Sequence, residues 1–256
     1  MHLVLAFLLL LAGCRKAEPA PAAADSASSG PCRTELFDGS RFTVCSAAGL
    51  RLELLVAGRD GRAYRSFAAL EHVLGRRAQQ VAFAMNAGMF DEAGLPIGLA
   101  VLDGREVKAL NRRAGGGNFH LLPNGVFLVR ADGSAAVVAT ERVKISKDIR
   151  LATQSGPMLL IEGKLHPRIE PDGRSRFVRN AVGVDERGEP MFVISEEAVS
   201  FGKLARLFRD RLGCRNALYL DGSVSSLWDP ANHRMDSFAG LGPMIVAIRD
   251  DQGKAR

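Results

Sequence analysis

Two carboxylates and one arginine lie where apolar segments of the chain begin or end. Glu196 and Asp221 each follow a short apolar run, and Arg179 directly precedes one. Carboxylates placed in this way can act as general acid and base, as a nucleophile or as cation ligands, and glycosyl transfer needs two of them. An arginine can clamp a phosphate through two parallel hydrogen bonds. We take these three as candidate catalytic residues, against the alternative that each is a cap, a turn residue or a surface ion-pair member.

Three short strands and one helix must position these groups. Apolar runs at 181–184, 191–194 and 217–220 predict the strands. Ser200 caps the predicted helix, whose apolar residues recur every three or four positions, and Gly213 ends it. Each candidate residue is therefore expected at the end of a buried element.

The remainder of the chain predicts strands, hairpins and one more helix. The second helix spans 66–74 and stops at Gly75. Further strands are predicted at 50–56, 81–85 and 244–248. Turn signals between β-type runs predict hairpins at Asp103-Gly104, Asn124-Gly125, Asp132-Gly133 and Glu162-Gly163. With two principal helices, the fold class is α+β, with a mainly antiparallel mixed sheet built from hairpins.

Size and charge narrow the classes of function. A chain of 256 residues with 47% apolar content can bury a full core, and we expect residues 32–256 to form a single domain. The net charge of +6 suits an anionic partner, but the basic residues are scattered among acidic ones. Two Tyr and one Trp give few stacking platforms. We therefore expect no nucleic-acid binding.

The amino terminus resembles a bacterial lipoprotein signal. The apolar run 3–11 leads into Leu11-Ala12-Gly13-Cys14. This resemblance implies that residues 1–13 are a signal peptide, that Cys14 is lipidated, and that the protein contacts the membrane through it. Because residue 15 is not Asp, an outer-membrane lipoprotein facing the periplasm is expected in a cell with two membranes. The start Met1-His2 lacks the usual positive charge, which leaves an ordinary signal peptide or a plain anchor as alternatives.

A tether and a pair of cysteines follow the signal. Residues 14–31 are rich in Ala, Pro and Ser and cannot bury enough apolar surface to fold. Cys32 and Cys45 flank a predicted strand pair, and an oxidising compartment makes a disulfide plausible, with two reduced thiols as the alternative. Cys214 has no evident mate and is expected to be a buried core residue.

Other polar positions follow predicted strands or lie in turns. Asn86 follows the strand 81–85, and the turn formed by Gln154, Ser155 and Gly156 could present amide groups to a bound oxygen. The alternative for that segment is a plain turn into a strand. The histidines show no zinc-ligand spacing.

Six motifs in order resemble the phosphodiester glycosidase family, over roughly residues 50–250. They are MNAGMF at 85–90, TQSGPML at 153–159, RNAVGV at 179–184, the strand ending in Glu196, LYLDGSVSS at 218–226 and GPMIVA at 242–247. The family pattern carries over to Arg179, Glu196, and Asp221 with Gly222, Ser225 and Ser226. Ser223 and Val224 replace glycines of that pattern, and Ala87 stands where a second glycine is common.

The resemblance implies cleavage of the C1–O bond of a sugar-1-phosphodiester in the cell envelope. Arg179 and the turn at 154–156 would hold the phosphate, Asn86 would orient the sugar, and Asn180 would belong to the same binding site. Glu196 or Asp221 would stabilise C1 or activate water. The sequence requires no cofactor, and a divalent cation at either carboxylate is left open. The alternatives are a non-catalytic lipoprotein that binds glycans or anionic polymers and, less well supported, a metal-dependent phosphodiesterase.

Overall fold

The computed structural model describes residues 30–250. The expected signal peptide, the lipidated Cys14 and nearly all of the tether lie outside the described residues. Within 30–250, no helix is long and apolar enough to span a bilayer.

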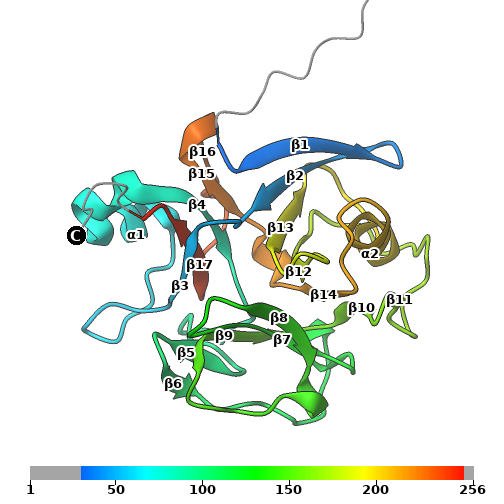
Figure 1. The fold of residues 1–256 in the computed structure, drawn as a ribbon, viewed down its shortest axis with the longest axis horizontal. Coiled ribbons are helices and arrows are strands. Elements are labelled where there is room, and N and C mark those ends of the chain that lie inside the picture. The colour runs from blue at the N-terminus through cyan, green and yellow to red at the C-terminus, as the bar shows by residue number, and fades with distance from the viewer. Residues whose placement is uncertain (1–29, 251–256) are drawn as a thin grey trace, which may run out of the picture.

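The described residues form three antiparallel sheets that meet around a common centre (Figure 1). The seven-stranded sheet has the order β1 (Cys32–Phe37), β2 (Ser40–Ser46), β13 (Pro190–Ser195), β12 (Asn180–Val184), β14 (Asn216–Tyr219), β10 (Met158–Ile161) and β11 (Lys164–Leu165). One five-stranded sheet has the order β16 (Arg234–Met235), β15 (Leu227–Asp229), β4 (Val81–Asn86), β17 (Met244–Ile248) and β3 (Arg51–Leu55). The other has the order β6 (Arg105–Lys108), β5 (Ala100–Leu102), β9 (Ile149–Ser155), β7 (Gly125–Arg130) and β8 (Ala135–Ala139).

Three phenylalanines join the sheets at their centre. Phe192 of β13 packs against Phe83 of β4 and Phe127 of β7, with ring centroids 5.4 and 5.6 Å apart. Each of these side chains comes from a different sheet, and all three are fully buried. Burial of one such ring contributes about 2 to 3 kcal/mol. The central cluster therefore packs the three sheets against one another.

The two predicted helices are confirmed in residues 30–250. Helix α1 (Phe67–Leu74) begins at Ser66, whose side chain accepts a hydrogen bond from the Ala69 amide. Helix α2 (Phe201–Asp210) begins at Ser200, which accepts from the Lys203 amide at 3.0 Å. Helix α2 packs on one face of the seven-stranded sheet, against β12, β13 and β14 (Figure 1). Phe201, the first residue of α2, packs against Tyr219 at the end of β14, with ring centroids 4.7 Å apart.

The α+β class and three of the four predicted hairpins are confirmed. The hairpin at Asn124-Gly125 is wrong. Gly125 is the first residue of β7, where it pairs with Ala139 on one side and Ser155 on the other. An Asn-Gly hairpin turn needs strands on both sides, but residues 118–120 form a 3₁₀ turn.

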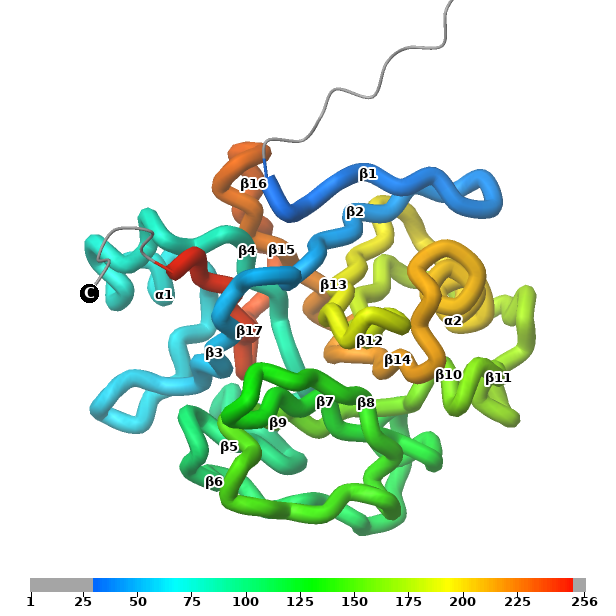
Figure 2. The backbone as a smooth tube through the Cα atoms, in the orientation of Figure 1, coloured from blue at the N-terminus to red at the C-terminus, as the bar shows by residue number. Residues whose placement is uncertain are grey.

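The predicted disulfide between Cys32 and Cys45 is present, and Cys214 is a buried free thiol. Burial raises the pKa of Cys214 to about 12, so at neutral pH it is protonated and a poor nucleophile. The disulfide joins directly opposed residues of β1 and β2, and β2 lies beside β13 (Figure 2). It thus secures the outer strand of the largest sheet.

Replacing both Cys32 and Cys45 by alanine is expected to lower the free energy of unfolding by about 3 kcal/mol, because the bond restrains an unfolded loop with a sequence separation of 13. Urea titration of the purified domain measures this change. Reductant should lower the unfolding midpoint of the unmodified protein and leave that of the variant unchanged. Equal midpoints for both proteins without reductant would contradict the expectation.

Candidate active site

Arg179 is a fully buried arginine held in an aromatic cage. It precedes β12, and its guanidinium carbon lies 3.6 Å from the centre of the Phe201 ring. The rings of Phe177 and Tyr219 have their centres 5.4 and 5.5 Å away. Nε donates to the Val199 carbonyl at 2.9 Å, which sets the plane of the guanidinium. These contacts fix the group without using all of its donors.

No carboxylate of residues 30–250 compensates the charge of Arg179. Its other side-chain partners are the carbonyl and hydroxyl of Ser175, at 3.1 and 3.0 Å, and the Tyr219 hydroxyl at 3.3 Å. Burial lowers the pKa of Arg179, and only Tyr219 acts in the opposite direction. A buried cation without a counter-ion is costly. The geometry is therefore that of a site prepared for an anion.

A pocket of about 460 Å³ opens beside this guanidinium. This volume lies within the range usual for sites that bind small molecules. Its lining comes from four segments: Asn118, the run Ser175, Phe177, Val178 and Arg179, the group Tyr219, Gly222, Ser223 and Ser225, and Phe238. The structure thus brings together Arg179, Gly222 and Ser225 of the residues singled out in the sequence.

A second pocket, of about 570 Å³, is larger but differs in its charges. Three arginines line it, and each pairs with acids: Arg51 with Glu53 and Asp250, Arg130 with Asp148, and Arg150 with Asp103. The charges of the arginines in this second pocket are therefore already neutralised by neighbouring acids. We therefore place the candidate active site in the pocket beside Arg179.

Asp221 lies two residues after β14, where the chain enters the short 3₁₀ turn η4 (Gly222–Val224). Its Oδ1 accepts hydrogen bonds from the amide of Ser223 at 3.2 Å and from its hydroxyl at 2.5 Å. Within the described part of the chain, no hydrogen bond engages Oδ2. The Asp221 side chain is therefore oriented through Oδ1, and Oδ2 is free to accept a hydrogen bond or a proton.

Two buried asparagines hold the loop that follows Asp221. Asn86, the last residue of β4, donates from Nδ2 to the Asp221 carbonyl at 2.7 Å and accepts from the Ser226 amide at 2.8 Å. Asn180 donates to the Asn86 side-chain oxygen at 2.9 Å and accepts from the Ser225 hydroxyl at 3.1 Å. The side chains of Asn86, Asn180 and Ser225 are therefore brought together, and their polar atoms are largely used in positioning the loop.

The segment Gln154–Gly156 ends β9 close to this network. Both polar atoms of the Gln154 side chain are engaged, since Oε1 accepts from the Leu99 and Asn111 amides and Nε2 donates to the Asn111 carbonyl. Ser155 is different, because its buried hydroxyl has no hydrogen-bond partner within residues 30–250. A Cβ at Gly156 would come within 2.8 Å of the Phe119 carbonyl, so the chain passes closely there.

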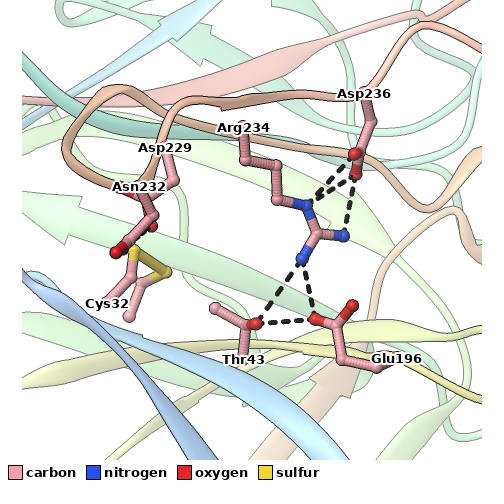
Figure 3. Close-up of a disulfide and its surroundings, with 8 residues drawn as sticks. Cys32, Thr43, Glu196, Asp229, Asn232, Arg234 and Asp236 are labelled. Carbon is pink, nitrogen blue, oxygen red and sulfur yellow. Dashed lines mark hydrogen bonds and ion pairs between the residues drawn. A yellow bond between two sulfur atoms is a disulfide. The ribbon is translucent and has the colours of Figure 1, made fainter. Parts of the chain in front are cut away.

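Glu196 lies away from the pocket, in an ion-pair cluster near the disulfide (Figure 3). Its Oε1 accepts from Arg234 at 2.7 Å and from the Thr43 hydroxyl at 2.6 Å, and Arg234 also pairs with Asp236. Side chains two positions apart along a strand share a face, so Glu196 shares a face with Ile194 and Arg179 shares one with Ala181. Ile194 and Ala181 pack into two different core clusters, on opposite faces of the seven-stranded sheet. Glu196 therefore faces the other side of the sheet from Arg179.

Several residues of the pocket were missed in the sequence. Tyr219 lies inside an apolar run, where a tyrosine gives no separate signal. Phe177 and Phe238 are 62% and 69% exposed, and the sequence does not show that two aromatic rings 61 positions apart share one rim. Asn118 begins the 3₁₀ turn at 118–120 and Ser175 lies in an irregular segment, and neither belongs to a sequence motif. Within residues 30–250, no group of three or more His, Cys, Asp or Glu side chains is arranged to hold a metal ion.

Comparisons with known proteins concern the sequence family and the fold of the chain. The sequence model described as NAGPA, phosphodiester glycosidase, matches residues 79–237, which is more than half of the chain. The uncharacterized protein YigE of Escherichia coli K12 is 40% identical over 149 residues, which cover 58% of this chain and 58% of YigE. The matched segment thus spans less than two thirds of that relative.

Three solved structures share the fold. The zebrafish N-acetylglucosamine-1-phosphodiester alpha-N-acetylglucosaminidase catalytic domain, auto-inhibited by its pro-peptide, superposes with a TM-score of 0.61 at 16% identity, over 90% of this chain and 87% of that one. A hypothetical protein from Synechocystis gives 0.52 at 15% identity, over 85% and 61%. A putative exported protein from Burkholderia pseudomallei gives 0.53 at 13% identity, over 81% and 73%.

Proposed function

The chain belongs to the phosphodiester glycosidase family, and from this premise we propose that it hydrolyses the C1–O bond of a sugar-1-phosphodiester. The observation that supports the proposal best is the buried guanidinium of Arg179, which has no carboxylate partner in the described residues and borders the pocket. A phosphodiester carries one negative charge at neutral pH and would supply the missing counter-ion.

The net reaction needs little protonation of the leaving group. Water bonds to C1 while the bond from C1 to the phosphate oxygen breaks, and the bonding electron pair leaves with that oxygen. The products are the free sugar and a phosphomonoester. One proton of the water stays on the new hydroxyl, and the other passes to a base. Because the phosphomonoester is a stable anion, catalysis depends on holding its growing charge and on activating the water.

We assign the base, or the group that stabilises C1, to Asp221 and not to Glu196. Asp221 does not itself line the pocket, but it is fixed through Oδ1, keeps Oδ2 unengaged within residues 30–250, and directly precedes Gly222 and Ser223, which do line it. Glu196 is paired with Arg234 on the other side of the sheet. Asn86 and Asn180 would act by holding the loop that carries Asp221, since their side chains bond to it and to each other. The Ser155 hydroxyl, which has no partner within residues 30–250, is fully buried and does not line the pocket, so we assign it no role in the reaction.

Hydrolysis in ¹⁸O-labelled water tests the proposal. The purified domain is incubated with a sugar-1-phosphodiester, and the products are analysed by mass spectrometry. Label in the sugar is the expected result, because water then attacks C1. Label in the phosphate would show attack at phosphorus and would replace the proposal by a phosphodiesterase. Binding of the substrate without turnover would show a non-catalytic glycan-binding protein.

We further propose that the protein acts in the cell envelope as a lipoprotein. The sequence around Leu11–Cys14 and the oxidised pair Cys32–Cys45 support this location. Replacing Cys14 by serine in the full chain should move the protein from the membrane fraction to the soluble fraction, as measured by immunoblotting. An unchanged distribution would contradict lipidation at this residue.

A further inference from the structure

Tyr219 is the buried residue of the pocket that the proposed reaction has not yet used. It ends β14, pairs with Ala181 of β12 and donates its amide to the Pro157 carbonyl. Its ring packs edge-on against Phe201, with centroids 4.7 Å apart and an interplanar angle of 87°. The side chain is 2% exposed and lines the pocket beside Arg179. Backbone and ring contacts thus hold the phenol group in one place.

The acceptor side of the phenol oxygen is occupied. Arg179 Nη1 donates to it at 3.3 Å. On another side, a Cβ at Gly222 would come 1.8 Å from the oxygen, so only a glycine lets the backbone pass there. Burial raises the pKa of Tyr219, which keeps the hydroxyl protonated at neutral pH. Since Arg179 is a donor, it cannot receive this proton.

No residue of the described part of the chain accepts a hydrogen bond from the Tyr219 hydroxyl. A buried hydroxyl proton without an acceptor is unfavourable, and the space next to it is the pocket. An anion that accepts from Arg179 would lie within reach of the phenol proton as well. The pair would then present one charged and one neutral donor to the same group.

We propose that the Tyr219 hydroxyl donates a hydrogen bond to a phosphate oxygen of the substrate beside Arg179, and that this bond strengthens as the phosphate gains its second negative charge. The proposal rests on the proposed hydrolysis. No proton is transferred in this step, since the hydrogen stays on the phenol while the electron pair of the C1–O bond moves to the phosphate. A bond that is stronger in the transition state than in the ground state raises kcat more than it lowers KM.

The variant Tyr219→Phe removes the oxygen and keeps the ring that packs on Phe201. With a sugar-1-phosphodiester as substrate, kcat is expected to fall about 10- to 100-fold, with KM changed less than about threefold. The matched control is Tyr64→Phe, since Tyr64 is the other tyrosine of the chain and packs in a separate core beside α1. The control should keep both constants. Equal kcat values for Tyr219→Phe and the unmodified protein would overturn the proposal.

Binding measurements separate this inference from the proposed hydrolysis. Calorimetry with glycerol phosphate, a dianion, and with dimethyl phosphate, a monoanion, requires no turnover. Tyr219→Phe should weaken glycerol phosphate binding about tenfold or more and dimethyl phosphate binding by less than about threefold. If the protein shows this pattern but hydrolyses no phosphodiester, the proposed hydrogen bond is supported and the proposed hydrolysis is refuted. Equal losses for both ligands, or no binding of either to the unmodified protein, would overturn the role of Tyr219.

Discussion

Replacing Asp221 by asparagine is expected to lower kcat for phosphodiester hydrolysis by about 10³-fold, because the amide cannot accept the proton of the attacking water. The side chain keeps its shape, and its remaining oxygen can still accept from Ser223. The expected change in the free energy of unfolding is therefore within about 1 kcal/mol. Steady-state kinetics on a sugar-1-phosphodiester, together with urea titration of the same preparation, measure both quantities.

The matched control is Glu196→Gln, which makes the same chemical change at the carboxylate that pairs with Arg234. Its kcat should remain within about threefold of the original, while the loss of its pairing with Arg234 lowers the free energy of unfolding by about 1 kcal/mol or less. If Glu196→Gln loses activity and Asp221→Asn keeps it, the roles assigned to the two carboxylates must be exchanged.

Replacing Arg179 by methionine is expected to lower kcat/KM by about 10³-fold and to abolish binding of inorganic phosphate. The same change removes a buried charge that lacks a carboxylate partner in residues 30–250, so we expect it to cost far less stability than activity. Phosphate should raise the Tm of the unmodified protein and leave the Tm of the variant unchanged, since a ligand stabilises only the state that binds it. Differential scanning fluorimetry with increasing phosphate measures this shift.

The control for this prediction is Arg176→Met, three residues earlier, where the arginine is exposed. That variant should respond to phosphate as the unmodified protein does. A phosphate-dependent Tm in Arg179→Met would show that anions bind elsewhere, for example among the arginines of the larger pocket.

The two helices could be predicted from the sequence, because a helix cap and an apolar periodicity depend only on neighbouring residues. The serine caps at positions 66 and 200 and the apolar periodicity of α1 and α2 depend on neighbouring residues only. The division into three sheets was not predicted, since it depends on pairings between distant strands, such as β2 with β13. The Asn124-Gly125 signal failed because one of the two strands it requires is absent.

The arrangement of the candidate site also depends on contacts between distant segments, which local sequence patterns do not predict. Alternation along β13 puts Glu196 on the same face as Ile194, but only the register of Asn180 opposite Ile194 shows that Arg179 lies on the other face. Tyr219 could not be singled out, because a buried tyrosine in an apolar run has the same pattern whether or not its hydroxyl meets a ligand. Arg179, Gly222 and Ser225 were found to border one pocket, which motif order alone does not establish.

The bonds of Asn86 to Asp221 and Ser226 span 135 and 140 residues of chain. Contacts between such distant positions form only after the intervening strands have closed long loops. The loop that carries Asp221 should therefore acquire its final shape among the last steps of folding. Recovery of the site during refolding would then report completed assembly of all three sheets, and a fragment lacking either β4 or residues 221–226 could not contain it.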